Sequence, residues 1–117
     1  MVRASTYVPA CGDIVWLDFD PQVGREQAGK RPALVLTPKS YNQLIGLAIV
    51  CPITSRTKGY PFEVQITGKK ITGAILADHA KSLDWKGRKA TLIERASEDV
   101  VLEVAAKLDT LLPKTSC

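Results

Sequence analysis

Long runs of apolar residues are missing from this sequence of 117 residues. A helix that crosses a membrane needs about 20 consecutive, mostly apolar residues, so the sequence predicts no membrane span. The first seven residues also lack the apolar segment of a secretory signal peptide. No internal repeat, low-complexity tract or linker interrupts the chain. We therefore expect a single domain over residues 1–117, with a modest core and further stabilisation by self-association.

Cysteine and histidine are scarce. The chain has three cysteines, Cys11, Cys51 and Cys117, and one histidine, His79. The cysteines are odd in number and widely spaced, and the sequence has no C-x-x-C motif and no Cys/His cluster. This pattern favours free thiols in a reducing cytoplasm and predicts no metal site.

Charge is unevenly distributed along the chain. The formal net charge is +4 at pH 7, and the cations gather in residues 21–32, 55–61 and 81–89, which we expect to be loops. Residues 97–112 instead carry four acids against one lysine. Basic loops are typical of a face that binds a polyanion, but they also serve solubility alone, and composition leaves both interpretations open.

Residues 13–20 alternate as a β-strand does. Val15, Leu17 and Phe19 share one face, which we expect in the core. The opposite face combines Ile14 and Trp16 with two acids. Such a mixture is typical of a docking surface, although Trp16 suits a partly buried packing position equally well.

Further strands are predicted by β-branched and alternating apolar patterns. They cover residues 33–37, 47–54, 62–66, 71–77 and 90–93. Residues 68–70 have the composition of a hairpin turn, and residues 83–88 are expected to be irregular. Ser40 is a candidate cap for one helical turn over residues 40–43.

The last element is predicted to be a helix that starts after Ser97 and stops before Pro113. Its apolar stripe consists of Val101, Val104, Ala105, Leu108, Leu111 and Leu112. Strands joined by short connections and followed by one helix predict an α+β fold. We expect a small, curled antiparallel sheet with the C-terminal helix packed on it.

Residues 24–32 are predicted to form a loop in which charged and amide side chains are concentrated. They bring Glu26, Gln27 and three cations between two strands, and rigid strands often present functional side chains in this way. Pro32 is expected to end the loop. The alternative is a solvated hairpin loop in which Glu26 and Arg31 make only a surface ion pair, worth about 0–1 kcal/mol.

Several short motifs together resemble the MazF/PemK family of toxins from toxin–antitoxin pairs, and its MazF members in particular. Their order and spacing fit over most of the chain. They are Gly12-Asp13-Ile14-Val15-Trp16, Phe19-Asp20-Pro21, Glu26-Gln27-Ala28-Gly29, Arg31-Pro32-Ala33-Leu34-Val35-Leu36, Tyr41-Asn42, Pro52-Ile53-Thr54, Lys58-Gly59-Tyr60-Pro61-Phe62-Glu63-Val64 and Lys81-Ser82-Leu83.

The resemblance implies an SH3-like barrel with appended helices, a homodimer, and a sequence-specific endoribonuclease that cuts single-stranded RNA, in particular mRNA. Members of this family work without a metal or other cofactor and leave a 2′,3′-cyclic phosphate and a 5′-hydroxyl. They inhibit translation and growth until a cognate MazE-like antitoxin with an acidic, disordered tail neutralises them. No membrane is implied.

Matching positions imply catalytic roles for Glu26, Arg31 and Thr54. The RNA-binding positions expected from the same comparison and from side-chain chemistry are Gln27, Lys30, Asn42, Ser55, Arg56, Lys58, Tyr60, His79 and Lys81. His79 departs from the family, in which glutamine is usual. A neutral imidazole cannot be donor and acceptor at one nitrogen, so the departure bears on sequence preference rather than on catalysis.

These residue types suit RNA cleavage through the ribose. A glutamate with a raised pKa can deprotonate the 2′-hydroxyl, which assigns Glu26 as the base. The planar fork of Arg31 can bind two phosphoryl oxygens, and Thr54 can add a neutral hydrogen bond. Lys58 suits a phosphate contact and Tyr60 suits base stacking, although both also suit an ordinary loop.

Two other classes of protein compete with this interpretation. CcdB-type toxins share the barrel but poison DNA gyrase through a C-terminal helix, without catalysis. A passive module that binds single-stranded RNA would hold the substrate and leave it uncut. The Glu26, Arg31 and Thr54 combination favours the nuclease.

Overall fold

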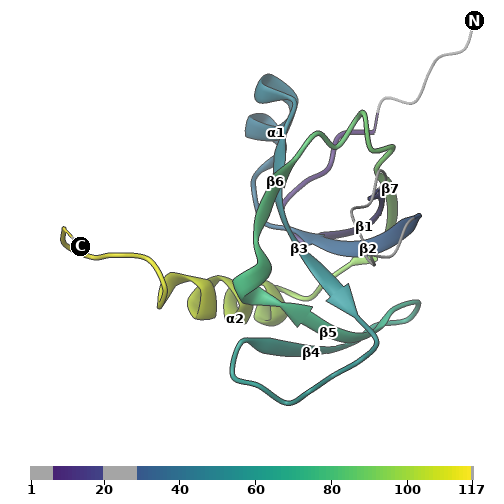
Figure 1. The fold of residues 1–117 in the computed structure, drawn as a ribbon. Helices are drawn as coiled ribbons and strands as arrows, with labels where there is room; N and C mark the ends of the chain where they lie inside the picture. The colour runs from purple at the N-terminus through teal and green to yellow at the C-terminus, as the bar shows by residue number, and fades with distance from the viewer. Residues whose placement is uncertain (1–6, 20–28, 117) are drawn as a thin grey trace, which may run out of the picture.

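The computed structural model describes residues 7–19 and 29–116, and the statements below concern those residues. They form seven strands, two α-helices and one short 3-10 helix (Figure 1). In chain order these are β1 (Asp13–Asp18), β2 (Lys30–Val35), α1 (Lys39–Ile45), β3 (Ala48–Thr54), β4 (Glu63–Thr67), β5 (Thr72–Leu76), η1 (Ala77–His79), β6 (Lys81–Leu83), β7 (Thr91–Arg95) and α2 (Glu98–Asp109).

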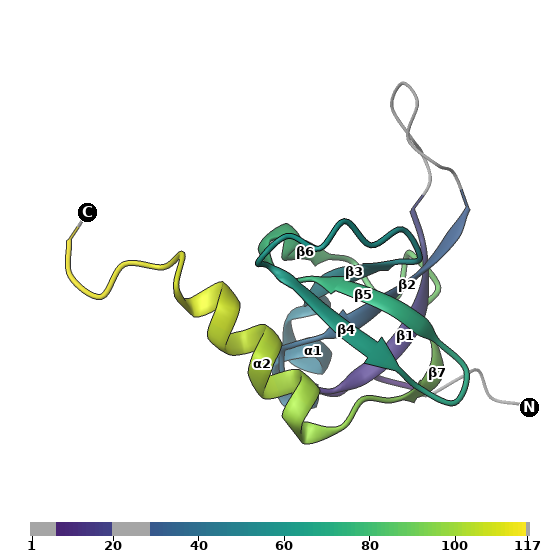
Figure 2. The same ribbon diagram turned by 90° about the horizontal axis from the view of Figure 1, so that it is seen from below.

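The strands make one curled antiparallel sheet in the order β4-β5-β3-β2-β1-β7 (Figures 1 and 2). β3 organises it, because one edge pairs with β2 while the other edge pairs first with β6 and then with β5. α2 contacts β4 and η1, and Figure 2 shows it lying beside β4. The predicted α+β class, a small barrel-like antiparallel sheet with a C-terminal helix packed on it, is confirmed.

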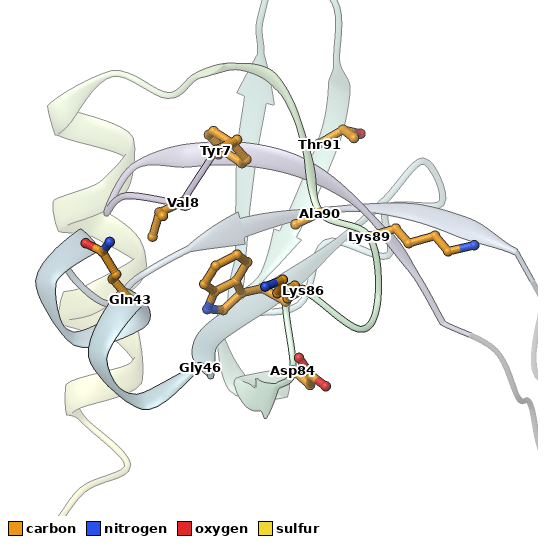
Figure 3. Close-up of a pocket in the computed structure, with 10 residues that line it drawn as sticks. Tyr7, Val8, Gln43, Gly46, Asp84, Lys86, Lys89, Ala90 and Thr91 are labelled. Carbon is orange, nitrogen blue, oxygen red and sulfur yellow. The ribbon is translucent and has the colours of Figure 1, made fainter. Parts of the chain in front are cut away.

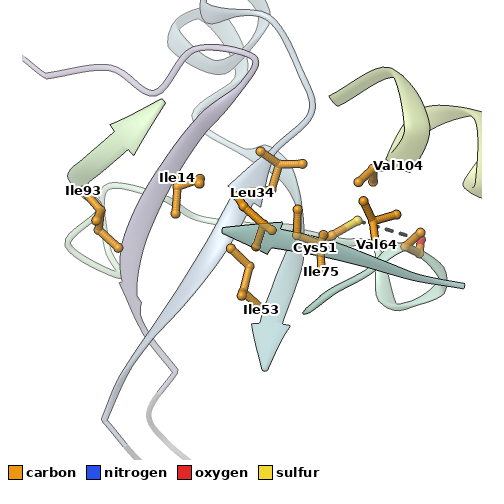
Figure 4. Close-up of a cluster of buried hydrophobic side chains, with 10 residues drawn as sticks. Ile14, Leu34, Cys51, Ile53, Val64, Ile75, Ile93 and Val104 are labelled. Carbon is orange, nitrogen blue, oxygen red and sulfur yellow. Dashed lines mark hydrogen bonds between the residues drawn. The ribbon is translucent and has the colours of Figure 1, made fainter. Parts of the chain in front are cut away.

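Both faces of the sheet are covered by apolar side chains, because neighbouring residues of a strand point to opposite faces. Ile14 belongs to the larger cluster, which is drawn in Figure 4. Val15 and Leu17 belong to the second cluster, against which Phe19 packs. The predicted core face is therefore confirmed. For the other face the structure shows the packing alternative, because Ile14 is fully buried and Trp16, partly buried, packs against the larger cluster.

β2 starts at Lys30, so Arg31 and Pro32 lie in the strand and not in the predicted loop. A proline fits there because the pairing of β2 with β3 starts only at Ala33, which leaves Pro32 at a local edge. Arg31 is thus held by a paired strand. Its partner in β1 is Leu17.

α1 is longer than the predicted single turn, and its cap differs. Its N-cap is Pro38, which makes no side-chain capping bond, so Ser40 is not the cap. The helix ends at Ile45 and its C-cap is Gly46, whose φ of 85° is the left-handed conformation that glycine adopts without strain. The Gly46 N–H donates to the Asn42 carbonyl oxygen.

α2 begins as predicted, since the Ser97 side chain accepts a hydrogen bond from the Val100 N–H. It ends at Asp109, earlier than the predicted stripe. Only part of that stripe packs against the sheet. Val104 is buried, whereas Leu111 and Leu112 lie beyond the helix and are each 52% exposed.

Two elements were not predicted. η1 begins at Ala77, the last residue of the predicted strand 71–77, and otherwise η1 and β6 occupy residues for which no regular structure was predicted. β6 is only three residues long. Its strand character comes from pairing with Ala48, Ile49 and Val50 of β3. Cys11 and Cys51 are free thiols, as predicted, and Cys117 lies outside the described residues. No described helix has the length and hydropathy to cross a membrane.

Candidate functional site

A groove of about 510 Å³ brings several predicted site residues together. It lies where the start of β2, the end of β3 and the start of β5 meet. Its lining residues are Lys30, Arg31, Pro32, Ile53, Thr54, Ser55, Arg56, Ile71 and Thr72. Two of the three predicted catalytic residues, Arg31 and Thr54, are therefore in one groove.

Sheet register explains why these two side chains meet. Ala33 of β2 pairs with Pro52 of β3. Arg31 and Thr54 are each two residues from this pair, so both project from the same face of the sheet. Antiparallel strands that are hydrogen-bonded to each other give such a pair a rigid base.

Thr54 sits at a close approach of two backbones. A Cβ on Gly73 of β5 would lie 2.4 Å from the Thr54 carbonyl oxygen, so only glycine fits at that position. The Thr54 Oγ1 accepts a hydrogen bond of 3.0 Å from the Arg56 N–H. This bond ties Arg56, which also lines the groove, to Thr54, and it leaves the Thr54 hydroxyl able to donate its proton.

The groove suits an anion. Among the described residues that line it are three cations, Lys30, Arg31 and Arg56, together with hydroxyl groups and no carboxylate. Phe19 connects a further cation to this region. The Arg31 guanidinium lies 6.0 Å and the Lys81 ammonium 5.8 Å from the centre of the Phe19 ring.

Residues 55–61, which carry Arg56, Lys58 and Tyr60, are held by a buried carboxylate. Glu63 is 7% exposed and accepts hydrogen bonds from the Lys58 and Gly59 N–H groups at 2.9 and 2.8 Å. This arrangement closes the loop onto β4. The Lys58 side chain remains exposed to solvent.

Tyr60 is tied to η1. Its hydroxyl donates to Asp78 Oδ1 at 2.6 Å, and this bond, with smaller effects of burial and of the Asp78 charge, raises the Tyr60 pKa to about 12. His79 Nε2 lies 3.8 Å from the same carboxylate oxygen, and its side chain is about half exposed. Asp78 therefore links two of the predicted RNA-binding residues.

Asn42 corrects the sequence interpretation. It was predicted to bind RNA, but it is fully buried and its amide is used within the protein. Its Nδ2 donates to the carbonyl oxygens of Pro9 and Thr37, and its Oδ1 accepts from the Thr37 hydroxyl. Asn42 therefore ties the N-terminal segment to α1 and is not available to a ligand.

Glu26 and Gln27, predicted as the catalytic base and as an RNA ligand, lie outside the described residues. Ser55 lines the groove, whereas Lys58, Tyr60 and His79 are not among its lining residues. Sequence reasoning missed Glu63, Asp78 and Phe19. Glu63 and Phe19 were inside quoted motifs, but nothing in the order of residues distinguished a buried, bonded carboxylate from an exposed one.

A second hollow, of about 850 Å³, holds none of the predicted catalytic residues (Figure 3). Trp85 forms part of its wall and donates from Nε1 to the Asn42 carbonyl oxygen, which joins the β6–β7 connection to α1. Lys86 and Lys89 face this hollow together with Asp84. We place the candidate site in the smaller groove because its cations and hydroxyl groups suit an anion and because it contains Arg31 and Thr54.

Metal ligands are not grouped in the part of the chain that the structure describes. No three side chains of His, Cys, Asp or Glu converge there as a cation site would require.

Comparison with known proteins gives consistent matches. A family model described as "PemK-like, MazF-like toxin of type II toxin-antitoxin system" matches residues 10–112. The chain is 44% identical to the endoribonuclease toxin MazF of Escherichia coli K12 over 108 residues, which are 92% of this chain and 97% of MazF. It is 35% identical to the Escherichia coli endoribonuclease PemK, over 86% of this chain and 80% of PemK.

Solved structures agree with these sequence matches. A crystal structure of MazE-MazF from Deinococcus radiodurans (Form-II) superposes with a TM-score of 0.86 and 52% identity. The match covers 93% of this chain and 99% of the other chain.

Proposed function

Because this chain belongs to the PemK-like, MazF-like family of type II toxins, we propose that it is an endoribonuclease that cleaves single-stranded RNA. The observation that carries the proposal is the cationic groove in which Arg31 and Thr54 meet. A groove lined by cations and hydroxyl donors fits a phosphodiester, whose phosphoryl oxygens accept hydrogen bonds from both.

The groove supports a reaction in which the ribose supplies its own nucleophile. Attack of the 2′-hydroxyl on the adjacent phosphorus gives a 2′,3′-cyclic phosphate and breaks the bond from phosphorus to the 5′-oxygen, which takes a proton from water and leaves as a 5′-hydroxyl. Negative charge on the phosphoryl oxygens is stabilised by the guanidinium fork of Arg31 and by a hydrogen bond from Thr54. An arginine side chain keeps its proton too firmly to act as a general acid, so the role of Arg31 is electrostatic.

Glu26 is proposed as the base that takes the proton of the 2′-hydroxyl. The proposal rests on its motif and on its position four residues before Lys30, where β2 begins. A carboxylate is the only chemistry among the predicted catalytic residues that can accept this proton at neutral pH. No step of this scheme requires a metal-bound water or another cofactor.

The RNA path is proposed to extend from the groove along the other cations and rings. Lys30, Ser55 and Arg56 belong to the groove itself. Lys58 and Lys81 would bind neighbouring phosphates, and Tyr60 and His79 would contact bases. Gln27 completes the predicted set. Cleavage of mRNA would inhibit translation and growth.

Partners and location are part of the proposal. By analogy with the MazE-MazF complex from Deinococcus radiodurans, a cognate MazE-like antitoxin would neutralise this toxin. We expect its acidic, disordered tail to compete with RNA for four cations, Lys30, Arg31, Arg56 and Lys58, and the competition to weaken as salt is added. The toxin is proposed to act as a homodimer in the cytoplasm.

The test is to incubate the purified protein with a long single-stranded RNA and to sequence the new 5′ ends, with and without excess EDTA. We expect cuts at a short recurring motif, 5′-hydroxyl ends, and the same pattern in EDTA. RNA that is retained but uncut would identify a passive binding module. Growth inhibition without any RNA cleavage would instead support a CcdB-like toxin that binds a protein.

A further inference from the structure

The β4–β5 turn, residues 68–71, forms one border of the catalytic groove. Ile71 and Thr72, at the end of this turn, line the groove together with Arg31 and Thr54. The geometry of the groove therefore depends on where this turn is held. The turn follows β4, which ends at Thr67, and precedes β5, which begins at Thr72.

A carboxylate from the other end of the sheet holds the turn. Glu94 of β7 accepts backbone hydrogen bonds from Lys69 at 3.0 Å, Lys70 at 2.9 Å and Ile71 at 2.8 Å. β4 and β7 are the two ends of the strand order, so these bonds connect the first and last strands of the open sheet. We call the three bonds the Glu94 link.

Gly68 leaves the space that the Glu94 link needs. A Cβ at Gly68 would lie 2.5 Å from Glu94 Oε2, a distance that real Cβ atoms do not tolerate. The Gly68 N–H meanwhile closes the turn by donating to the Ile71 carbonyl oxygen at 2.7 Å. The turn thus has a glycine beside the carboxylate and three consecutive N–H groups aimed at it.

The link depends on the ionised carboxylate. An ionised carboxylate only accepts hydrogen bonds, and its two oxygens can receive all three N–H groups. The backbone hydrogen bonds, the one from Lys70 first, lower the Glu94 pKa below its ordinary value, which agrees with the geometry. The lysine side chains are not the donors, so the link does not require their charges.

We propose that Glu94 is a positioning residue for RNA cleavage. By fixing the β4–β5 turn, it keeps Ile71 and Thr72 in the wall of the groove where Arg31 and Thr54 bind the phosphate. The inference rests on the proposed endoribonuclease function. Glu94 itself does not line the groove, so it acts through the turn.

The proposal predicts an effect opposite in sign to simple electrostatics. Removing a negative charge from a protein generally strengthens its binding to RNA. Loss of the Glu94 link should instead lower kcat/KM for RNA cleavage. Small misplacements of groups at a reacting phosphate cost up to about 100-fold in rate.

Three variants separate these effects. Glu94→Gln keeps the size of the side chain but presents an NH₂ group to N–H donors. Gly68→Ala displaces the carboxylate without changing any charge. Glu98→Gln, at the exposed first turn of α2, also removes one negative charge, but Glu98 accepts none of the three bonds of the Glu94 link, so this variant serves as the control.

Each variant is assayed for kcat/KM on a short RNA, for thermal unfolding, and for hydrogen exchange of the Lys69, Lys70 and Ile71 amides. Assays are run at a temperature where circular dichroism shows every variant folded. We expect faster exchange and roughly 10–100-fold lower kcat/KM for Glu94→Gln and Gly68→Ala. Glu98→Gln should match the wild type or bind RNA slightly more tightly. The variant that combines Glu94→Gln with Gly68→Ala should have a kcat/KM no lower than the lower of the two single variants, since both substitutions remove the same link.

Faster amide exchange with kcat/KM equal to that of Glu98→Gln would show a purely structural link and would overturn the proposal. Unchanged amide exchange in both Glu94→Gln and Gly68→Ala would overturn it as well. A wild-type protein that leaves RNA uncut would contradict the proposed function itself, and the positioning role with it.

Discussion

Arg31 is the residue on which the proposed chemistry depends most among those described. It is held by β2 pairing, lies in the groove with Thr54, and approaches the Phe19 ring. A planar guanidinium positioned by a paired strand can contact two phosphoryl oxygens without losing much side-chain entropy. A lysine at the same position would offer a point charge only.

We therefore expect Arg31→Ala to lower the RNA cleavage rate by about 10²–10³-fold, as for other preorganised donors to developing negative charge. Arg31→Lys should recover only a small part of this loss. Single-turnover cleavage rates at saturating protein measure the effect. Lys39→Ala, an exposed cation at the start of α1, controls for charge and should cut RNA at the wild-type rate. Equal losses in Arg31→Ala and Lys39→Ala would argue for a general charge effect.

Asn42 has a structural role at the same scale. Asn42→Ala removes the donor to the carbonyl oxygens of Pro9 and Thr37 and the acceptor of the Thr37 hydroxyl proton. We expect the free energy of unfolding to fall by about 1–3 kcal/mol, since a buried polar group left unsatisfied costs that much. Urea unfolding measures it, with Gln43→Ala, an exposed neighbour, as the control. An unchanged unfolding midpoint combined with weaker RNA binding would restore the original prediction that Asn42 binds RNA.

At the scale of elements, the Glu94 link makes part of the fold depend on pH. A carboxylate whose pKa is lowered in the folded state stabilises the protein above its unfolded pKa, and this contribution is lost as the pH falls through the folded pKa. For Glu94 the folded pKa is the lowered one. Its stabilisation is thus fully present at neutral pH and disappears in acid.

The free energy of unfolding should consequently be higher for the wild type than for Glu94→Gln at neutral pH, and the difference should shrink as the pH drops below the ordinary glutamate range. Denaturant unfolding of both proteins over a pH series gives this difference directly. Glu98→Gln should show a smaller and flatter difference. A difference in the free energy of unfolding between wild type and Glu94→Gln that grows toward acid pH would contradict this prediction.

Local patterns predicted most elements because each was long and periodic. The alternation of Val64 and Ile66 identified β4, and Ser97 identified the start of α2. β6 was missed because three residues carry no period, and its pairing with β3 joins segments more than 30 residues apart. Arg31 and Pro32 were placed in a loop because a proline usually interrupts a strand, whereas here it occupies a local edge.

The sequence identified residues that line the candidate site but not the contacts that support it. Arg31 and Thr54 were identified from their motifs, and the structure brings them into one groove. Glu63, Asp78 and Glu94 hold the surrounding loops through hydrogen bonds to residues that are 4 to 25 positions away. Partners of this kind depend on tertiary packing. No spacing rule in the sequence identifies them.

At the scale of the whole molecule, apolar side chains remain exposed on several elements of the single chain. The described residues include Leu44 at 83%, Leu102 at 58% and Leu92 at 49% exposure. Neighbouring exposed apolar side chains, such as Leu44 and Ile45 on α1, are typical of a surface that a partner covers. A two-fold dimer is the commonest closed arrangement that buries such a surface.

We accordingly expect a dimer at micromolar concentration, measurable by sedimentation velocity or light scattering. Basic grooves from two subunits would then serve one RNA. Leu44→Asp and Leu102→Asp test which surface is used, because a charge in a buried interface is strongly unfavourable. A monomer that still cleaves RNA at the full rate would contradict the expected assembly and leave the groove assignment intact.

The central claim is that the RNA supplies its own nucleophile within the Arg31–Thr54 groove. The most direct measurement compares an RNA oligonucleotide with one in which the single ribose 5′ of the cut is replaced by deoxyribose, in excess EDTA. The account predicts rapid cleavage of the all-ribose strand and none of the substituted strand, with both bound equally well. Cleavage at the deoxyribose position, or activity that vanishes in EDTA and returns with magnesium, would contradict it.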